Sequence, residues 1–454
     1  MPFNRQETKV KARRNEDMRT QKADLLLMNV DFLDENWERV RGRDIVIRDG
    51  VIVEIRKHGD SETVYEANET VDGGEMLYLP GFIDSHMHTG QQLLRGRVLD
   101  AMPMIWKRIM LPFESTLNEE KMRLSAELAA LDMIRSGTCG FIDAGSYFMD
   151  KAAEVYETSG LRGALSVSTM DEEGLPASIA MTAEEAIEKT DILFERFHGK
   201  GNLKVFYSLR SLISCSEDLI ERAAIRAREK GTTLQAHMNE YPGEITPFLS
   251  RFQKRPYEFL DAKGILGPWF LGAHSLLLSE EEKDLMCDRQ VRICHCPFSN
   301  CGKAVPETPS LLRRQIPVGI GTDGAAHGGL SLWNEMRIFR SVMNVTCGVP
   351  LAEPAIMPAK TILDMVTKGG AACLGEETGT IAVGKRADLI GIDLDAPHLW
   401  IHGVISNTLV ESVSAEDVKN VIVGGRMLMK NREILTLDEE KIRREAQAFT
   451  KAIW

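Results

Sequence analysis

The 454-residue chain has no run of 18 apolar residues, so the sequence predicts no membrane-spanning helix. It has no excess of positive charge either. Its formal net charge is −12, which argues against a nucleic-acid partner and against an anionic membrane surface. Residues 1–22 are charged and lack an apolar core, so we expect an N-terminal extension and not a secretory signal. Short-period repeats and low-complexity segments are absent too, and the composition is that of a globular protein.

The eight cysteines are scattered, so the chain lacks the pattern of a small disulfide scaffold. A reducing cytoplasm is the simplest location for such a protein. Cys294, Cys296 and Cys301 lie close together, as the ligands of a thiolate metal site would. Cys294 and Cys296 flank His295, however, and would point away from it on a strand. We therefore expect buried free thiols, because cysteine packs as a small apolar side chain.

Strand signals gather at the two ends of the chain. Asp49-Gly50 stands between two apolar runs, and this dipeptide is typical of a β-hairpin turn. Short apolar runs return late in the chain, where Gly424-Gly425 supplies another turn. We predict that residues 23–79 and 385–454 build one small β-sandwich domain from both chain ends, with a C-terminal helix.

The middle of the chain alternates between short apolar runs and amphipathic stretches, which is typical of parallel β/α units. Each of eight candidate strands is followed by a helix or a long excursion. The candidate strands are 77–83, 139–143, 164–168, 203–208, 233–237, 269–274, 291–294 and 318–322, and the clearest helical stretches are 119–135, 183–197, 217–229 and 280–289. The pattern indicates the α/β class and predicts a distorted (β/α)8 TIM barrel over residues 80–384.

Four histidines and an aspartate fall at the carboxyl ends of the predicted barrel strands, where barrel enzymes carry their chemistry. His86 and His88 end the first strand and point to the same face, being two residues apart. The fifth, sixth and eighth strands end in His237, His274 and Asp323. Imidazole and carboxylate groups suit Zn²⁺ or Fe²⁺, with a water molecule completing the shell. His274 either joins the ligands or holds that water.

Glu240 lies three residues past His237, in the loop beyond the fifth strand. A carboxylate at this place can move a proton between the water and a substrate, which is the role of a general acid and base. The alternative is a solvated carboxylate of the loop. We predict the catalytic role.

Together these residues resemble the amidohydrolase superfamily, and more closely its mononuclear aminohydrolase/chlorohydrolase branch. That branch contains thioadenosine/S-adenosylhomocysteine deaminases, guanine deaminases and s-triazine hydrolases. The resemblance covers nearly the whole chain. It is carried by the segments 80–88, 93–96, 273–274, 295–300, 321–323 and 379–389 and by the element His237-x-x-Glu240.

By this resemblance, four residues bind one divalent metal ion, with Zn²⁺ expected before Fe²⁺. They are His86, His88, His237 and Asp323. Binuclear members of the family carry a bridging lysine at the end of the fourth strand. Lys204 lies at the beginning of that strand here, at the wrong end of the barrel, and this position favours a single metal ion.

The resemblance further implies hydrolytic deamination, in which a metal-bound hydroxide attacks the amino-bearing carbon of an N-heterocycle and ammonia leaves. Glu240 would be the proton shuttle, and His274 would orient the attacking water with the help of Asp323. Two alternatives stay open. A related hydrolase would displace chloride or an alkylamine from an s-triazine, and a barrel without activity would serve as a binding protein.

Four residues are candidates for binding the substrate. Arg210 stands where thioadenosine deaminases usually carry a histidine, and it favours an exocyclic oxygen or an anionic group because a guanidinium only donates hydrogen bonds. A structural ion pair is the alternative for Arg210. Gln91 can present its amide to a ring edge, Trp106 can stack on a flat ring or belong to the core, and His327 can face the pocket. The substrates considered are oxopurines, pterins, thioadenosine-type nucleosides and triazines, and the resemblance also implies a homo-oligomer, a dimer or larger.

Overall fold

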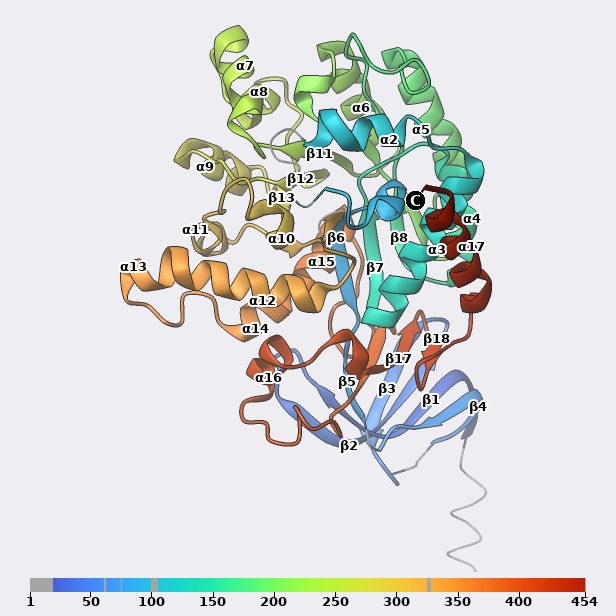
Figure 1. Cartoon of the computed structure of the whole chain (residues 1–454). Helices are drawn as coiled ribbons and strands as arrows, with labels where there is room; N and C mark the ends of the chain where they lie inside the picture. Colours follow the sequence, from blue (N-terminus) through green and yellow to red (C-terminus); the bar gives the residue numbers. More distant parts are fainter. Residues whose placement is uncertain (1–18, 61–62, 75, 99–104, 325–327, 454) are drawn as a thin grey trace, which may run out of the picture.

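The computed structural model describes residues 19–60, 63–74, 76–98, 105–324 and 328–453. Figure 1 shows an α/β barrel above a separate β-sheet, in which strands from the two ends of the chain lie side by side. The fold class predicted from the sequence is confirmed. His327 and most of the expected N-terminal extension lie outside the described residues.

The separate sheet contains nine hydrogen-bonded strands, five from the N-terminal and four from the C-terminal part of the chain. They are β1 (Arg19–Leu33), β2 (Arg39–Arg48), β3 (Val51–Lys57), β4 (Thr63–Asp72), β5 (Met76–Pro80), β16 (Leu389–Asp393), β17 (Val418–Val423), β18 (Arg426–Lys430) and β19 (Glu433–Ile434). The order is β19-β18-β17-β16-β5-β1-β2-β3, and β4 pairs with β1. The antiparallel pair β5–β16 joins the two chain ends. β1 begins at Arg19, before the boundary expected at residue 23.

Two turns predicted from the sequence are present in this sheet. Asp49 and Gly50 join β2 to β3 with φ angles of 53° and 73°. Gly424 and Gly425 join β17 to β18 with φ angles of 55° and 77°. Positive φ at both central positions is the backbone that a tight hairpin needs, and glycine adopts it at little cost.

The barrel strands form two parallel five-stranded sheets, β15-β6-β7-β8-β9 and β10-β11-β12-β13-β14. Their bounds are β6 (Phe82–His88), β7 (Thr138–Asp143), β8 (Arg162–Leu165), β9 (Leu203–Val205), β10 (Tyr207–Leu209), β11 (Leu234–Met238), β12 (Phe270–His274), β13 (Arg292–His295), β14 (Val318–Ile320) and β15 (Asp323–Gly324). The fourth strand is interrupted at Phe206 and the eighth at Gly321-Thr322, so the ring is distorted. A Cβ at Gly321 would lie 2.6 Å from the backbone nitrogen of His86, which explains why glycine stands at this crossing.

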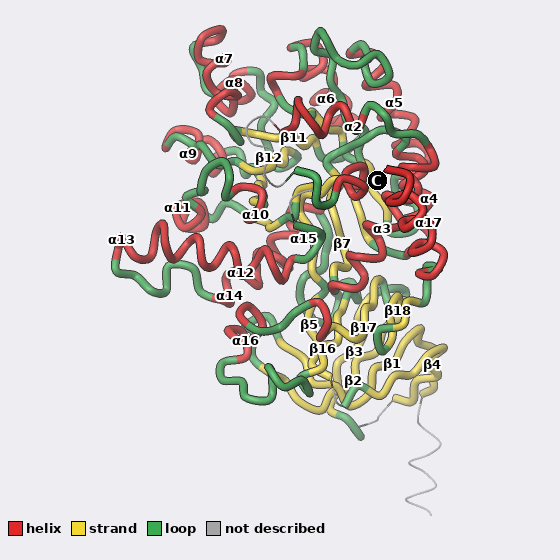
Figure 2. The backbone as a smooth tube through the Cα atoms, viewed as in Figure 1, coloured by secondary structure: helices red, strands yellow, loops and turns green. Residues whose placement is uncertain are grey.

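Helices cover the outside of the barrel (Figure 2). The four stretches with helical spacing correspond to α3 (Glu119–Ser136), α5 (Ala183–Phe197), α6 (Glu217–Glu229) and α9 (Glu280–Asp288). The other helices are α2 (Leu111–Glu114), α4 (Met149–Ser159), α7 (Pro242–Phe252), α8 (Pro256–Ala262), α10 (Pro297–Asn300), α11 (Thr308–Arg313), α12 (Leu332–Met343), α13 (Val349–Leu351), α14 (Ala359–Asp364), α15 (Gly370–Leu374), α16 (Ile405–Glu411) and α17 (Glu439–Ile453). Short helical turns are η1 (Thr89–Leu94), η2 (Trp106–Met110), η3 (Leu212–Ser214), η4 (Asn344–Gly348), η5 (Met365–Gly369) and η6 (Ala415–Asp417). In the described part of the chain, none of these helices is long and apolar enough to cross a membrane.

A buried ion pair fastens the barrel to the sheet. Arg162, at the start of β8, donates from Nε to Asp388 Oδ2 at 2.8 Å and from Nη2 to Oδ1 at 3.1 Å. Asp388 directly precedes β16, and its backbone oxygen accepts from Gly81 before β6. The start of two barrel strands is therefore held against the returning end of the chain.

All eight cysteines are free. Cys294 and Cys296 are buried as expected, but Cys301 is exposed, so the prediction of a buried thiol is wrong there. It follows β13 and lies just past the short helix α10, beyond the strand whose burial guided the prediction.

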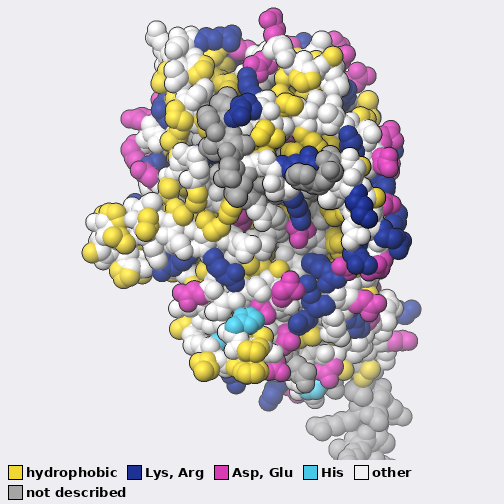
Figure 3. All heavy atoms as spheres, in the orientation of Figure 1, with side chains coloured by type: hydrophobic (Ala, Val, Ile, Leu, Met, Phe, Trp, Pro, Cys, Tyr) yellow, Lys and Arg dark blue, Asp and Glu magenta, His cyan; other side chains and the backbone are white. Residues whose placement is uncertain are grey.

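The face of the molecule drawn in Figure 3 carries charged side chains of both signs, interspersed. Apolar side chains gather at the projecting tip where α12 leads through η4 into α13. Val345, Val349 and Leu351 are exposed at this tip.

Candidate active site

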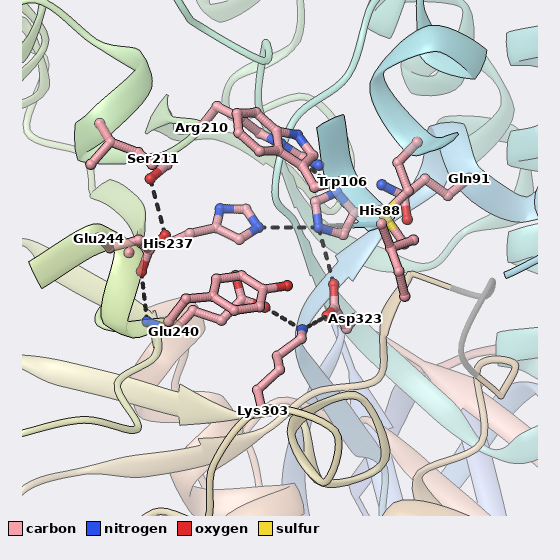
Figure 4. Close-up of a pocket in the computed structure, with 15 residues that line it drawn as sticks. His88, Gln91, Trp106, Arg210, Ser211, His237, Glu240, Glu244, Lys303 and Asp323 are labelled. Atoms are coloured by element: carbon pink, nitrogen blue, oxygen red, sulfur yellow. Dashed lines mark hydrogen bonds and ion pairs between the residues drawn. The ribbon is translucent and has the colours of Figure 1, made fainter. Parts of the chain in front are cut away.

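Five side chains from four barrel strands converge at one mouth of the barrel. Figure 4 shows three of them, His88, His237 and Asp323, pointing toward one another. His88 Nε2 lies 3.3 Å from His237 Nε2 and 3.2 Å from Asp323 Oδ1. His86 Nε2 lies 3.8 Å from the same Asp323 oxygen. His274, from β12, has its ring centre 5.0 Å from that of His86. The structure thus brings together the histidines and the aspartate that the sequence placed at strand ends.

The chemistry of this cluster fits a metal ion. Ligand atoms of His86, His237 and His274 lie within 4.8 Å of one another, and so do those of His86, His88 and Asp323. Both ring nitrogens of His86 and Nε2 of His274 are buried without a hydrogen-bond partner among the described residues. Leaving such an atom unsatisfied costs about 1–3 kcal/mol, and a metal ion would satisfy it. Burial holds the pKa of His86, His237 and His274 well below the usual value, so these rings are neutral, as metal ligands must be.

Two residues of this cluster and one neighbour have left-handed backbone conformations that residues other than glycine seldom adopt. The φ angles are 48° at Asn239, 67° at His274 and 61° at Asp323. Asn239 directly follows β11, His274 ends β12, and Asp323 begins β15 after the break in the eighth strand. Strain of this kind is held by the surrounding structure and is common at functional sites.

Two buried aspartates that the sequence did not single out stand behind the cluster. Asp84 accepts hydrogen bonds from the Thr322 hydroxyl at 2.6 Å and from the His86 backbone nitrogen at 3.2 Å. Asp143 accepts from the Thr89 backbone nitrogen at 2.8 Å. Burial raises the pKa of Asp84 to about 7. Asp84 ties the first strand to the break in the eighth strand and so supports the spacing of the histidines.

Glu240 lies in the cavity just beyond β11, with Oε1 3.5 Å from His274 Nε2. The residue is only 7% exposed, so it is not a solvated carboxylate of the loop. Its backbone nitrogen donates to Glu244 Oε2 at 2.6 Å, and the Ser211 hydroxyl donates to Glu244 Oε1 at 3.1 Å. Burial raises the pKa of Glu244 to about 8, and the nearby charge of Glu240 adds to this shift.

The segment after β13 supplies three residues whose contacts with the site sequence reasoning missed. Lys303 forms an ion pair with Glu240 and lies 3.6 Å from Asp323 Oδ2. The Ser299 hydroxyl donates to the same Asp323 oxygen at 2.6 Å. Asn300 Nδ2 lies 3.0 Å from His274 Nδ1. Ser299 and Asn300 belong to a segment that carried the family resemblance, but nothing in the sequence distinguished Lys303 from the other lysines.

Three of the four residues expected to bind substrate line one cavity. They are Arg210, Gln91 and Trp106, and the Arg210 guanidinium carbon lies 5.8 Å from the Trp106 ring centre. Ile105, Met110 and Ile213 form the apolar part of the cavity wall. An apolar pocket with a few converging polar groups is the usual form of a small-molecule site. The fourth candidate, His327, is not among the described residues.

Arg210 is already engaged with other side chains. Its Nη1 donates to His88 Nδ1 at 3.0 Å, because a guanidinium has no acceptor. Its Nη2 lies 3.8 Å from Glu114 Oε1, and that oxygen also accepts from Gln91 Nε2 at 2.7 Å. Arg210 and Glu114 therefore form a buried ion pair on the cavity wall, as the structural alternative for Arg210 supposed.

An α/β barrel with a His/Asp metal-binding group at its mouth is the architecture of a metal-dependent barrel hydrolase. The chain belongs to the amidohydrolase family, whose family model matches residues 77–428. It is 32% identical to a 5'-deoxyadenosine deaminase of Methanosarcina mazei, over 94% of this chain and 97% of the relative. It is 31% identical to a 5-methylthioadenosine/S-adenosylhomocysteine deaminase of Syntrophobacter fumaroxidans, over 96% of this chain and 100% of the relative. Its fold is similar to that of a zinc-bound adenosine deaminase from Xanthomonas campestris, with a TM-score of 0.87, 24% identity and coverage of 96% and 99% of the two chains.

Proposed function

We propose that the protein is a hydrolytic deaminase of an amino-substituted N-heterocycle and works with one zinc ion. The single observation that carries the proposal is the position of Glu240 beside His274, facing the His/Asp cluster from the cavity. The two relatives named as deaminases support it, since each matches nearly the whole chain.

His86, His88, His237 and Asp323 would hold the zinc ion, because their ligand atoms converge at the barrel mouth. A zinc ion bound in this way lowers the pKa of a water molecule to about 7. Lys204, the candidate bridge to a second metal, instead pairs with Glu376 at 2.6 Å, at the opposite end of the fourth strand. This contact supports a site for one ion.

The protein's own residues then handle the protons. His274 orients the attacking water with the help of Asp323, which lies at the same mouth of the barrel. Glu240 takes a proton from that water and delivers it to the ring nitrogen beside the reacting carbon. It then carries the second proton of the water, from the hydroxyl group added to that carbon, to the leaving amine as the carbonyl forms and the carbon–nitrogen bond breaks. Ammonia departs as a neutral molecule because the amine has been protonated. General acid–base catalysis of this kind contributes about 10²- to 10⁴-fold to the rate.

The charges on the cavity wall favour a neutral substrate. Arg210 is paired with Glu114 and Lys303 with Glu240, so neither cation is left to balance an anionic group. Neutral oxopurines, pterins, thioadenosine-type nucleosides and aminotriazines fit better than phosphorylated or carboxylated analogues. Trp106 would stack on the ring, and Gln91 would meet its edge. Three expectations remain predictions: that His327 faces the pocket, that the protein is cytoplasmic, and that it forms a homo-oligomer.

The rival activity is displacement of chloride or an alkylamine from an s-triazine, and Glu240 argues against the chloride reaction alone. Chloride leaves without a proton, whereas an amine must be protonated to leave. A screen of zinc-loaded protein against aminopurines, adenosine-type nucleosides, pterins and aminotriazines decides between them. We expect ammonia from at least one member of the panel. Chloride or alkylamine from a triazine, with no ammonia from any compound, would overturn the proposal.

A further inference from the structure

We propose that Lys303 is a positioning residue, which holds the Glu240 carboxylate in the orientation that proton transfer requires. The inference rests on the proposed function, in which Glu240 moves the proton. Lys303 itself handles no proton in this account and acts through Glu240.

The surroundings of Lys303 carry the inference. Its side chain is only 4% exposed, and a buried ammonium group is stable only when charges and hydrogen bonds compensate it. Lys303 Nζ pairs with Glu240 Oε1, donates to the Ser299 hydroxyl at 2.7 Å and lies 3.6 Å from Asp323 Oδ2. It also lies 5.4 Å from the centre of the Tyr241 ring. Both carboxylates that compensate it belong to the candidate active site.

Hydrogen bonds fix the segment between β13 and Lys303, and so fix the position of the Lys303 ammonium group. Cys296 donates its backbone N–H to Asn300 Oδ1 at 2.8 Å, and Lys303 donates its own to the Asn300 backbone oxygen at 2.8 Å. Asn300 also touches His274, and Ser299 touches Asp323. One segment, residues 296–303, thus reaches three residues of other strand ends that handle water or protons, although it contributes no member of the metal-binding cluster.

The contact selects one oxygen of Glu240. Lys303 and His274 both approach Oε1 of this carboxylate. These two contacts fix the position of Oε1 and, through it, the orientation of the whole carboxylate group. Without the ammonium group the carboxylate loses its anchor, and its buried charge loses its nearest partner. We expect slower proton transfer with little change in substrate binding or in the metal-binding cluster.

Three variants test this in the zinc-loaded full chain. Lys303→Met removes the charge, and Lys303→Arg keeps a cation. Lys283→Met is the matched control, because Lys283 is a lysine with a 2%-exposed side chain that pairs with two glutamates on and near α9, away from the cavity. Using a substrate found in the ammonia screen, we expect Lys303→Met to lower kcat by about 10- to 100-fold with KM within about threefold. Lys303→Arg should recover part of that loss, and Lys283→Met should leave kcat unchanged.

A double variant separates positioning from a general structural effect. If Lys303 acts through Glu240, Lys303→Met should lower kcat by less than about threefold further when Glu240→Gln is already present. Multiplicative losses, a wild-type kcat in Lys303→Met, or loss of zinc from that variant would overturn the inference.

A further measurement does not depend on activity. The urea midpoints of wild type, both single variants and the double variant should be non-additive if the two side chains are coupled. A wild type that releases no ammonia from any compound would refute the proposed function. The midpoints would then decide whether Lys303 holds Glu240 at all: additive midpoints would refute the contact, and coupled ones would support it.

Discussion

The buried pair of Arg210 and Glu114 allows a prediction that separates structure from substrate binding. Glu114 Oε1 and Arg210 Nη2 are 3.8 Å apart, and the side chains are only 1% and 4% exposed. Unit charges at this distance attract by about 4 kcal/mol at an effective dielectric constant of about 20. Arg210→Met leaves the Glu114 carboxylate buried, with Gln91 still donating to it. We expect the free energy of unfolding to fall by about 3 kcal/mol, because removing one member of a buried ion pair strands the other.

Urea denaturation of the metal-free protein measures this change without a contribution from metal binding. Adding Glu114→Gln to Arg210→Met should restore most of the stability, since no unpaired carboxylate remains. Arg222→Met is the control and should change stability little, because Arg222 pairs with Asp218 on the surface. If Arg210→Met proves as stable as the wild type, the charge-pair reasoning is refuted, and Arg210 becomes a free donor for the substrate.

Two further predictions concern the metal-binding cluster and the pH dependence of stability. His86→Ala should weaken zinc binding by at least about 100-fold in a competition with a chromophoric chelator, since loss of outer contacts alone costs 10- to 100-fold; unchanged affinity would remove His86 from the ligand set. Burial raises the pKa of Glu244 from 4.5 to about 8, so the protonated form stabilises the fold at low pH and this contribution is lost as the pH rises through 8. Glu244→Gln should therefore gain stability relative to the wild type between pH 6 and pH 9, measured as urea midpoints. If the midpoints of variant and wild type differ by the same amount at both pH values, Glu244 titrates outside this window.

The sequence revealed the parts of the site that depend on strand ends. His86 and His88 are visible as a pair because alternate residues of a strand share a face. His237, His274 and Asp323 each follow a short apolar run, and in a parallel barrel all such positions meet at one mouth. The family resemblance rested on these same segments, and the family assignment is confirmed.

The contacts that complete the site were beyond sequence reasoning, because they join residues far apart along the chain. Glu114 pairs with Arg210 across 96 positions, and Lys303 reaches Glu240 across 63. No periodicity connects such residues, and a lysine in a loop ordinarily points to solvent. Arg210 is a further example. Its guanidinium group suggested a contact with the substrate, because the sequence does not show that Glu114 lies beside it.

Catalysis in the proposed mechanism depends on Glu240 as the group that moves the proton. The decisive measurement is the rate of ammonia release by zinc-loaded Glu240→Gln, compared with the wild type on the same substrate and with the zinc content of both determined. Glutamine keeps the size of the side chain but cannot exchange a proton. We predict an unchanged zinc content and a rate lower by about 10²- to 10⁴-fold. A Glu240→Gln protein that binds zinc and releases ammonia at a near wild-type rate would contradict the account.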